Sequence, residues 1–243
     1  YEYTRSKSPL SYTSTFPTLL QREGDFSQTK TTAGQVMTIY DPFNTFTNAA
    51  GNLERRPIPG NVIPKSRFDP MAAKALAYFP KPNTTGTPIT ETNNWFEKGI
   101  NRGPGQQTNL RADHNFSANN RLSGRYSYTR GRGDPPNLFK DLAPAFTFNY
   151  GPSMSTATSI VSDFTRIQSA TSLWSIRYGL TYSTYWRDPM EPFDLMQLGF
   201  PKYMKDQATF AVFPTIAPDG YTDIGTEGWL IMDRQEGVHH FSG

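Results

Sequence analysis

The stretch "TSLWSIRYGLTYSTYW", residues 171–186, alternates large apolar side chains with small polar ones. The apolar set is Trp174, Ile176, Tyr178, Leu180 and Tyr182, and Trp186 closes the series. The intervening set is Ser175, Arg177, Gly179, Thr181 and Ser183. A period of two predicts a β-strand whose two faces meet different surroundings.

The chemistry of the two faces indicates which surroundings these are. Small polar groups and one arginine are unsuited to a dry core, so we expect their face to be wet. The other face is aliphatic in its middle and aromatic towards both ends, which is typical of a strand that crosses a bilayer. A length of ~12 residues also fits, because a tilted membrane strand needs ~9–11.

A second alternating region, residues 107–130, predicts a hairpin around the polar tetrad 117–120, "SANN". Residues 156–186 predict a second hairpin, and alternation along the two hairpins divides their side chains into two sets, one for each face of the sheet. The set expected to face lipid is Leu122, Tyr126, Tyr128, Trp174, Ile176, Tyr178, Leu180 and Tyr182. The set expected to face water in the lumen is Arg111, Asp113, Arg121, Arg125 and Arg177.

The composition agrees with strands that bury one face in something already apolar. Only 36% of the 243 residues are hydrophobic, below the ~45–50% usual for globular domains, and 14% of the chain is aromatic. The 24 basic and 21 acidic residues are interspersed, so no electrostatic footprint for nucleic acid is present, although a pI near 9.0 allows contact with anionic lipid or polysaccharide. The absence of cysteine excludes disulfides and thiolate chemistry. No run of residues is apolar for long enough to form a transmembrane helix.

The connections between the expected strands are unequal in length. Residues 1–106 are expected to form the end of a first strand and a long loop region with a short helix at 70–79. A second long loop is expected at 131–155. A third long loop is expected within 187–243, followed by the start of a further strand, "GWLIMDRQ". Short turns alternating with long connections are typical of outer-membrane barrels, whose long loops are extracellular. The predicted fold is therefore all-β: a segment of a large antiparallel transmembrane β-barrel with long extracellular loops and one short loop helix.

No motif predicts catalysis, a cofactor or a metal. We interpret the tripeptide at 132–134, "RGD", as an ordinary turn, and the three histidines, His114, His239 and His240, as structural or solvated. The carboxylates near strand ends, Asp113, Asp163 and Asp188, show no spacing that predicts an acid/base pair. We expect a protein that is not an enzyme and that binds no nucleic acid.

Several blocks resemble TonB-dependent, Oar-like outer-membrane receptors. In order they are "FPTLLQREGDFSQ", "IYDP", "RRPIPGNVIPKSRFDPMAAKALAYFPKPN", "NNW", "LRADHNFSANNRLSGRYSYTR" and "LGFP", and the resemblance extends from about residue 1 to about residue 225. The final segment, "GVHHFSG", is similar to the start of a barrel strand. The blocks in one order are specific where any single one would not be.

The resemblance implies a plugged 22-stranded barrel in the outer membrane of a Gram-negative bacterium, taking up a large, unidentified substrate. The sequence shows no plug, no TonB-interacting segment and no carboxypeptidase-regulatory-like domain, so we expect it to be a segment of a longer receptor. Its expected partners are outer-membrane lipid, the remainder of the barrel and plug, and a TonB-type energy-coupling protein. A secreted or surface β-rich adhesive or carbohydrate-binding module is the alternative, supported by the exposed aromatics and the Pro- and Asn-rich loops.

Overall fold

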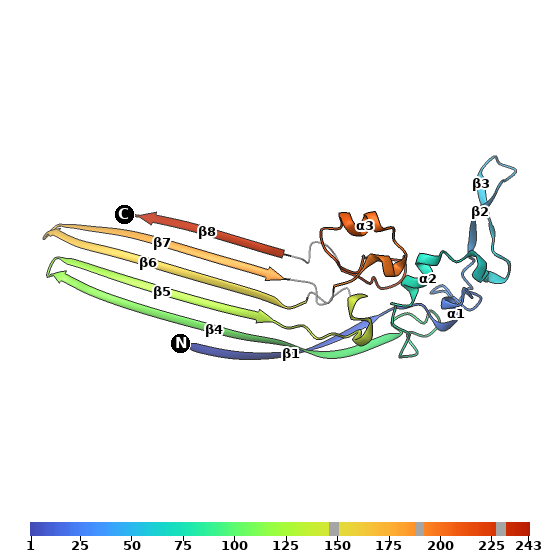
Figure 1. Ribbon diagram of the computed structural model, residues 1–243, viewed down its shortest axis with the longest axis horizontal. Coiled ribbons are helices and arrows are strands. Elements are labelled where there is room, and N and C mark those ends of the chain that lie inside the picture. Colours follow the sequence, from blue (N-terminus) through green and yellow to red (C-terminus); the bar gives the residue numbers. More distant parts are fainter. Residues whose placement is uncertain (146–150, 188–191, 227–231) are drawn as a thin grey trace.

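The computed structural model describes residues 1–145, 151–187, 192–226 and 232–243. Its main element is a single six-stranded antiparallel sheet, with the long connections gathered at one end (Figure 1). The strands, in their order across the sheet, are β1 (Glu2–Ser14), β4 (Trp95–Ser117), β5 (Asn120–Gly133), β6 (Ser153–Ser169), β7 (Ser172–Arg187) and β8 (Met232–Ser242). The expected antiparallel all-β fold is confirmed.

Two tight hairpin turns lie at the end of the sheet opposite the long connections (Figure 1). Ser117 pairs with Asn120 across β4 and β5, and Ser169 pairs with Ser172 across β6 and β7, so each turn contains two residues. The Ser117 hydroxyl accepts hydrogen bonds from the Asn119 backbone N–H at 3.2 Å and from Asn120 Nδ2 at 2.9 Å. The polar tetrad is therefore a turn, as the sequence predicts.

The long connections contain more regular structure than expected. In place of one helix at 70–79, the described part of these connections forms three α-helices: α1 (Leu19–Arg22), α2 (Pro70–Leu76) and α3 (Lys202–Gln207). Short 3-10 helices lie at Pro59–Asn61, Lys65–Arg67, Lys140–Ala145 and Leu195–Leu198, and a small hairpin is formed by β2 (Tyr40–Thr47) and β3 (Leu53–Pro57). Helix α2 ends early because Tyr78 and Phe79 donate to carbonyls three residues back, which tightens the chain and turns Phe79 into a core.

Several predicted boundaries are wrong because pairing with β1 extends the sheet. Strand β4 begins at Trp95 rather than near residue 107, although three glycines and Pro104 in this segment resemble loop sequence. Every residue of β1 from Glu2 to Ser14 pairs with this extension of β4, and such a partner, distant in sequence, leaves no local signal. The expected last strand at 228–235 falls partly outside the described residues; β8 runs from Met232 through the "GVHHFSG" segment.

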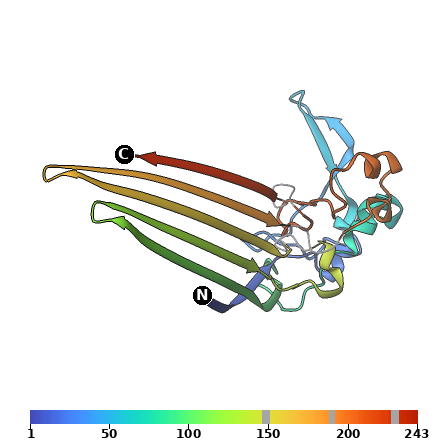
Figure 2. The same ribbon diagram turned by 60° about the vertical axis from the view of Figure 1, so that its left-hand side comes forward.

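The buried core lies in the gathered connections, and the sheet contributes to it where β1 and β4 meet them, at Ser14 and Trp95. We call this part, residues 15–94, 135–145 and 192–226, the lobe. Aromatic rings dominate its interior: Phe16 lies 5.6 Å from Trp95 and 5.7 Å from Phe139 between ring centroids, and Phe193 lies 4.8 Å from Phe213. No residue of β5 to β8 is buried, and Figures 1 and 2 show these strands as one uncovered layer. Among the described residues, no helix is long and apolar enough to cross a membrane.

Candidate functional site: two faces of one sheet

The apolar face of the sheet is built by cross-strand rows. Tyr126 pairs with Ile160 and Ile160 with Leu180. Other rows of this face join Leu122 through Phe164 to Ile176 and Tyr128 through Thr158 to Tyr182. All eight residues expected to face lipid share this face. Further apolar residues lie on it, Trp186 from the apolar series of β7 and five that were not in the set expected to face lipid: Leu110, Phe116, Ile160, Phe164 and Phe241. Their contact with lipid stays a prediction; the structure establishes the common face.

These side chains have no protein cover on their outer side. Trp174 is 62% exposed, Ile176 is 55% exposed and Leu110 is 62% exposed. An exposed apolar surface of this kind marks an interaction with a partner or a membrane. Tryptophans near both ends of β7, with leucine between them, match the aromatic belts of a bilayer-spanning strand.

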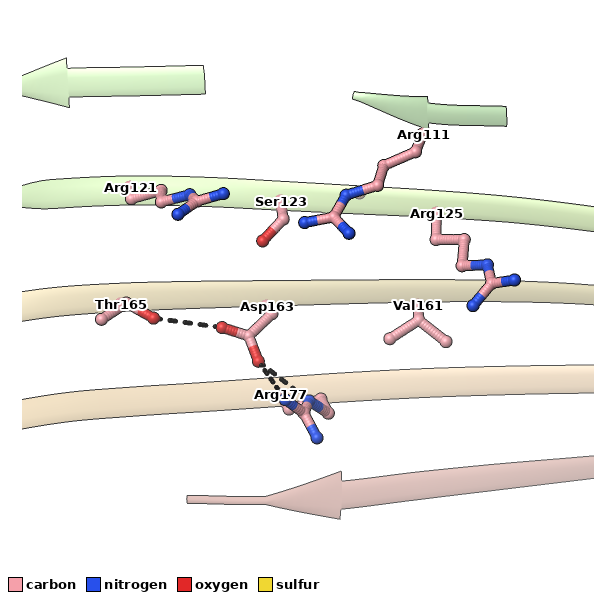
Figure 3. A pocket seen from close by; sticks show the side chains of 9 residues that line it. Arg111, Arg121, Ser123, Arg125, Val161, Asp163, Thr165 and Arg177 are labelled. Carbon is pink, nitrogen blue, oxygen red and sulfur yellow. Dashed lines mark hydrogen bonds and ion pairs between the residues drawn. The ribbon is translucent and has the colours of Figure 1, made fainter. Parts of the chain in front are cut away.

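The opposite face carries all five residues expected to line the lumen. Arg111 pairs with Arg125 in the register of β4 and β5, and Asp163 pairs with Arg177 in that of β6 and β7. They form an open groove of about 560 Å³ across four strands, whose side chains Figure 3 shows on one face. The arginines Arg111, Arg121, Arg125 and Arg177 line this groove together with Asp163 and small side chains.

Ion pairs fix most of the groove's charges. Asp113 accepts from Arg111 Nε at 2.8 Å and from Arg121 Nη2 at 2.9 Å. Asp163 accepts from Arg177 Nε at 2.8 Å and from the Thr165 hydroxyl at 3.1 Å (Figure 3). Four arginines face two carboxylates, so the groove is positively charged. Guanidinium groups suit carboxylate or phosphate groups of a passing solute.

The groove lacks the arrangement of an acid/base pair. Asp113 lies beside Ser123, and Ser123 beside Asp163, so a strand separates the two carboxylates and each has its own arginine. Asp188, the third carboxylate considered, lies outside the described residues. Within the described ranges, no group of three or more His, Asp or Glu residues is placed to hold a metal ion.

The other motifs are accounted for locally. The "RGD" segment is the extended end of β5 and not the turn expected, because Arg132 and Gly133 pair with Met154 and Ser153 of β6 and the Asp134 backbone pairs with that of Arg102. Arg132 Nε also donates to Asp134 Oδ1 at 2.7 Å. His239 Nδ1 lies 2.9 Å from the Tyr178 hydroxyl, whereas His240 pairs with Gly179 on the opposite face. Alternation therefore separates the two adjacent histidines, as expected for a strand.

The lobe packs on the same face as the arginine groove. Trp95, Glu97 and Gly99 alternate along β4 in phase with Arg111, and each touches the lobe: Trp95 is buried in its core, Glu97 pairs with Lys140 at 2.9 Å, and Gly99 lies under Pro136. The lobe thus folds over the polar side of the sheet.

Sequence reasoning missed this lobe as an ordered body. Its core residues come from segments in which apolar residues show no regular spacing. The only signal in the sequence for a buried core there was the repeated occurrence of Phe, Tyr and Trp within Pro-rich stretches. It also missed the basic residues that continue the apolar face towards the lobe, because their alignment depends on the pairing of β1 with β4.

Comparison with known proteins agrees with this two-faced sheet. The family model described as "outer membrane beta barrel domain" matches residues 1–243, the whole chain. The searches of curated proteins and of solved structures each found no match. An antiparallel meander with an exposed apolar face, a polar groove behind it and a family match over its full length lead to one conclusion: the chain belongs to the outer membrane β-barrel domain family.

Proposed function

We propose that this outer-membrane chain forms part of the wall and the extracellular cap of a TonB-dependent receptor that takes up a large substrate. The observation that carries the proposal is the position of the lobe on the groove side of the sheet, where a solute entering from outside would meet it before the arginines. The ordered sequence blocks that resemble Oar-like receptors support the same role.

The edges of the sheet support a place within a larger barrel. Strands β1 and β8 are the two ends of the strand order, and no described strand pairs with their outer edges. Unpaired backbone groups in hydrocarbon cost several kcal/mol each, so a sheet in lipid must close on itself. We infer that additional strands complete the barrel, that a plug occupies its lumen, and that a TonB-type protein of a Gram-negative cell supplies the energy.

The test is energy-dependent uptake in cells. A strain lacking the receptor is complemented with the wild type or with Arg125→Glu, which changes the groove without removing an ion pair. Growth on candidate polymers as sole nutrient and uptake of their fluorescent derivatives are then measured, with and without the TonB-type protein. We expect uptake that requires both proteins and is altered by Arg125→Glu.

Two results would contradict this role. Uptake that persists without energy coupling would indicate a passive channel. Loss of surface attachment or polysaccharide binding in the deletion strain, with unchanged uptake of every compound, would favour the adhesive alternative.

A further inference from the structure

The apolar face changes character where the sheet approaches the lobe. Beyond Tyr128, the residues of β5 on the same face are Arg130 and Arg132, before Asp134. Arg130 lies in the row that joins Gln106 to Tyr3; the next row joins Pro104 to Arg5, and the one after it joins Arg102 to Lys7. We call five residues the basic patch: Arg5, Lys7, Arg102, Arg130 and Arg132. Alternation along β1, β4 and β5 places all of them on the face that carries Leu110 and Tyr128.

Most of the patch lacks a compensating charge. Arg132 is paired with the Asp134 carboxylate at 2.7 Å, and Arg5 lies over the Tyr3 ring at 5.5 Å from its centroid. The side chains of Lys7, Arg102 and Arg130 are exposed and have no acidic partner among the described residues. The patch is therefore a strongly positive surface.

Lys7 and Arg102 are direct cross-strand partners. Like charges directly opposite each other destabilise a sheet, because their Cβ atoms are only about 4.5–5.5 Å apart. An anion bound between them would remove this repulsion. Since the two cations lie on the same face as Arg130 and Arg132, one ligand with more than one negative group could engage all four.

The patch is local, not a ring of charge at this height. In the row of Arg130, strands β6 to β8 carry Thr156, Thr184 and Gln235, and in the row of Arg132 they carry Met154, Trp186 and Asp233. Cations that served only a general attraction to an anionic membrane surface would not need to be clustered on three adjacent strands. A concentrated patch above an apolar surface fits one amphiphile with a phosphorylated head and hydrocarbon tails.

We propose that the basic patch binds the phosphate groups of a lipid of the outer leaflet, whose acyl chains lie along Leu110, Tyr126 and Tyr128. Basic side chains beside a membrane attract anionic head groups, and aromatic rings sit at that same interface. The proposal rests on the outward orientation of the lobe in the proposed function. Inorganic phosphate shares the head-group chemistry but lacks the contacts along the apolar rows.

Lipid retention by the assembled barrel tests the proposal. Wild type and a Lys7→Gln/Arg102→Gln/Arg130→Gln variant are reconstituted in phosphatidylcholine nanodiscs containing either bisphosphorylated lipid A or its dephosphorylated form. They are then extracted in detergent, and the retained lipid is measured by mass spectrometry. We expect the wild type to retain the phosphorylated lipid at least about tenfold better than the variant, and to show no such preference for the dephosphorylated lipid.

The control removes three positive charges elsewhere. Lys65→Gln/Lys74→Gln/Lys81→Gln changes exposed lysines of the lobe and should retain lipid as the wild type does. Heat-dependent gel mobility shows whether each variant forms the barrel, and where the triple variant does not, Arg130→Gln alone is compared with Lys74→Gln.

Three outcomes would overturn the proposal: equal retention by the wild type and the patch variant, equal retention of the two lipids, and displacement of the lipid by inorganic phosphate. Protease added to intact cells reports separately on orientation. A lobe that is protected from it would contradict the outward placement, whereas failure of uptake alone would leave the lipid result unchanged.

Discussion

Leu180→Arg is the sharpest perturbation of the apolar face. Leu180 lies six residues from Trp174 and six from Trp186, and it pairs with Ile160 in the middle of the apolar rows. Twelve steps of ~3.4 Å at a tilt of ~45° place these tryptophans ~29 Å apart along the membrane normal, close to the ~25 Å apolar band of a barrel. Leu180 is therefore expected at the midplane, where an arginine facing lipid destabilises a barrel by ~2–4 kcal/mol.

Thr181→Arg is the matched control. Thr181 lies one residue further along β7, at nearly the same depth, but it pairs with Ser159 on the groove face and is exposed. An arginine there remains in water, so its effect is expected to be within about 0.5 kcal/mol. The difference, at least ~1.5 kcal/mol, corresponds to a factor of ~10 or more in the folding equilibrium.

The assay is reversible unfolding of the assembled barrel in lipid vesicles by guanidinium, followed by tryptophan fluorescence and gel mobility. Equal losses of stability for the two variants would refute the assignment of the faces. A larger loss for Thr181→Arg would invert it.

Three further predictions concern the lobe, each measured as its resistance to proteolysis and its melting temperature in the assembled barrel. Gly99→Val should destabilise the packing of the lobe on β4 by ~1–3 kcal/mol, because the added Cβ would lie 2.6 Å from Pro136 Cβ. A Cβ at Gly124 would meet nothing within 4 Å, so Gly124→Ala should leave the lobe in place. Arg22→Ala should cost roughly 2–4 kcal/mol because the guanidinium donates to four backbone carbonyls, and unchanged protease resistance would contradict this role. The hydrogen bonds from Arg67 lower the pKa of Asp41. The pair should therefore stabilise the lobe at pH values above the unfolded pKa of ~3.9, and this stabilisation should be lost as the pH falls through the lower pKa of the folded state. Asp41→Asn should remove that part of the lobe's acid sensitivity, and an identical pH profile of melting temperature in the variant would count against it.

The membrane strands could be predicted from the sequence because their signal is local. In β7 the side chains alternate between the two faces of the sheet, so the pattern from Trp174 to Trp186 was sufficient to divide the residues of this strand between those faces. The two-residue turns followed from short polar segments at 117–120 and 168–172. The register that joins Leu122 to Phe164, by contrast, needed the structure.

The lobe could not be predicted in this way. Phe16, Phe79, Trp95 and Phe139 meet in its core from four separate segments, and nothing in their local sequence indicates which rings contact each other. The basic patch was hidden for the same reason. Lys7 and Arg102 are 95 positions apart in sequence, and only the pairing of β1 with β4 brings them opposite each other.

Labelling of single cysteines along β7 tests the central claim most directly. The chain contains no cysteine, so each substitution from position 174 to position 183 introduces one unique thiol. In the assembled barrel, a water-soluble maleimide should label the odd positions, 175 to 183, while fluorophores at the even positions, 174 to 182, should be quenched by nitroxide-labelled lipid. Uniform labelling along the strand, or quenching at the odd positions instead, would contradict a sheet with one face in lipid and the other in a water-filled lumen.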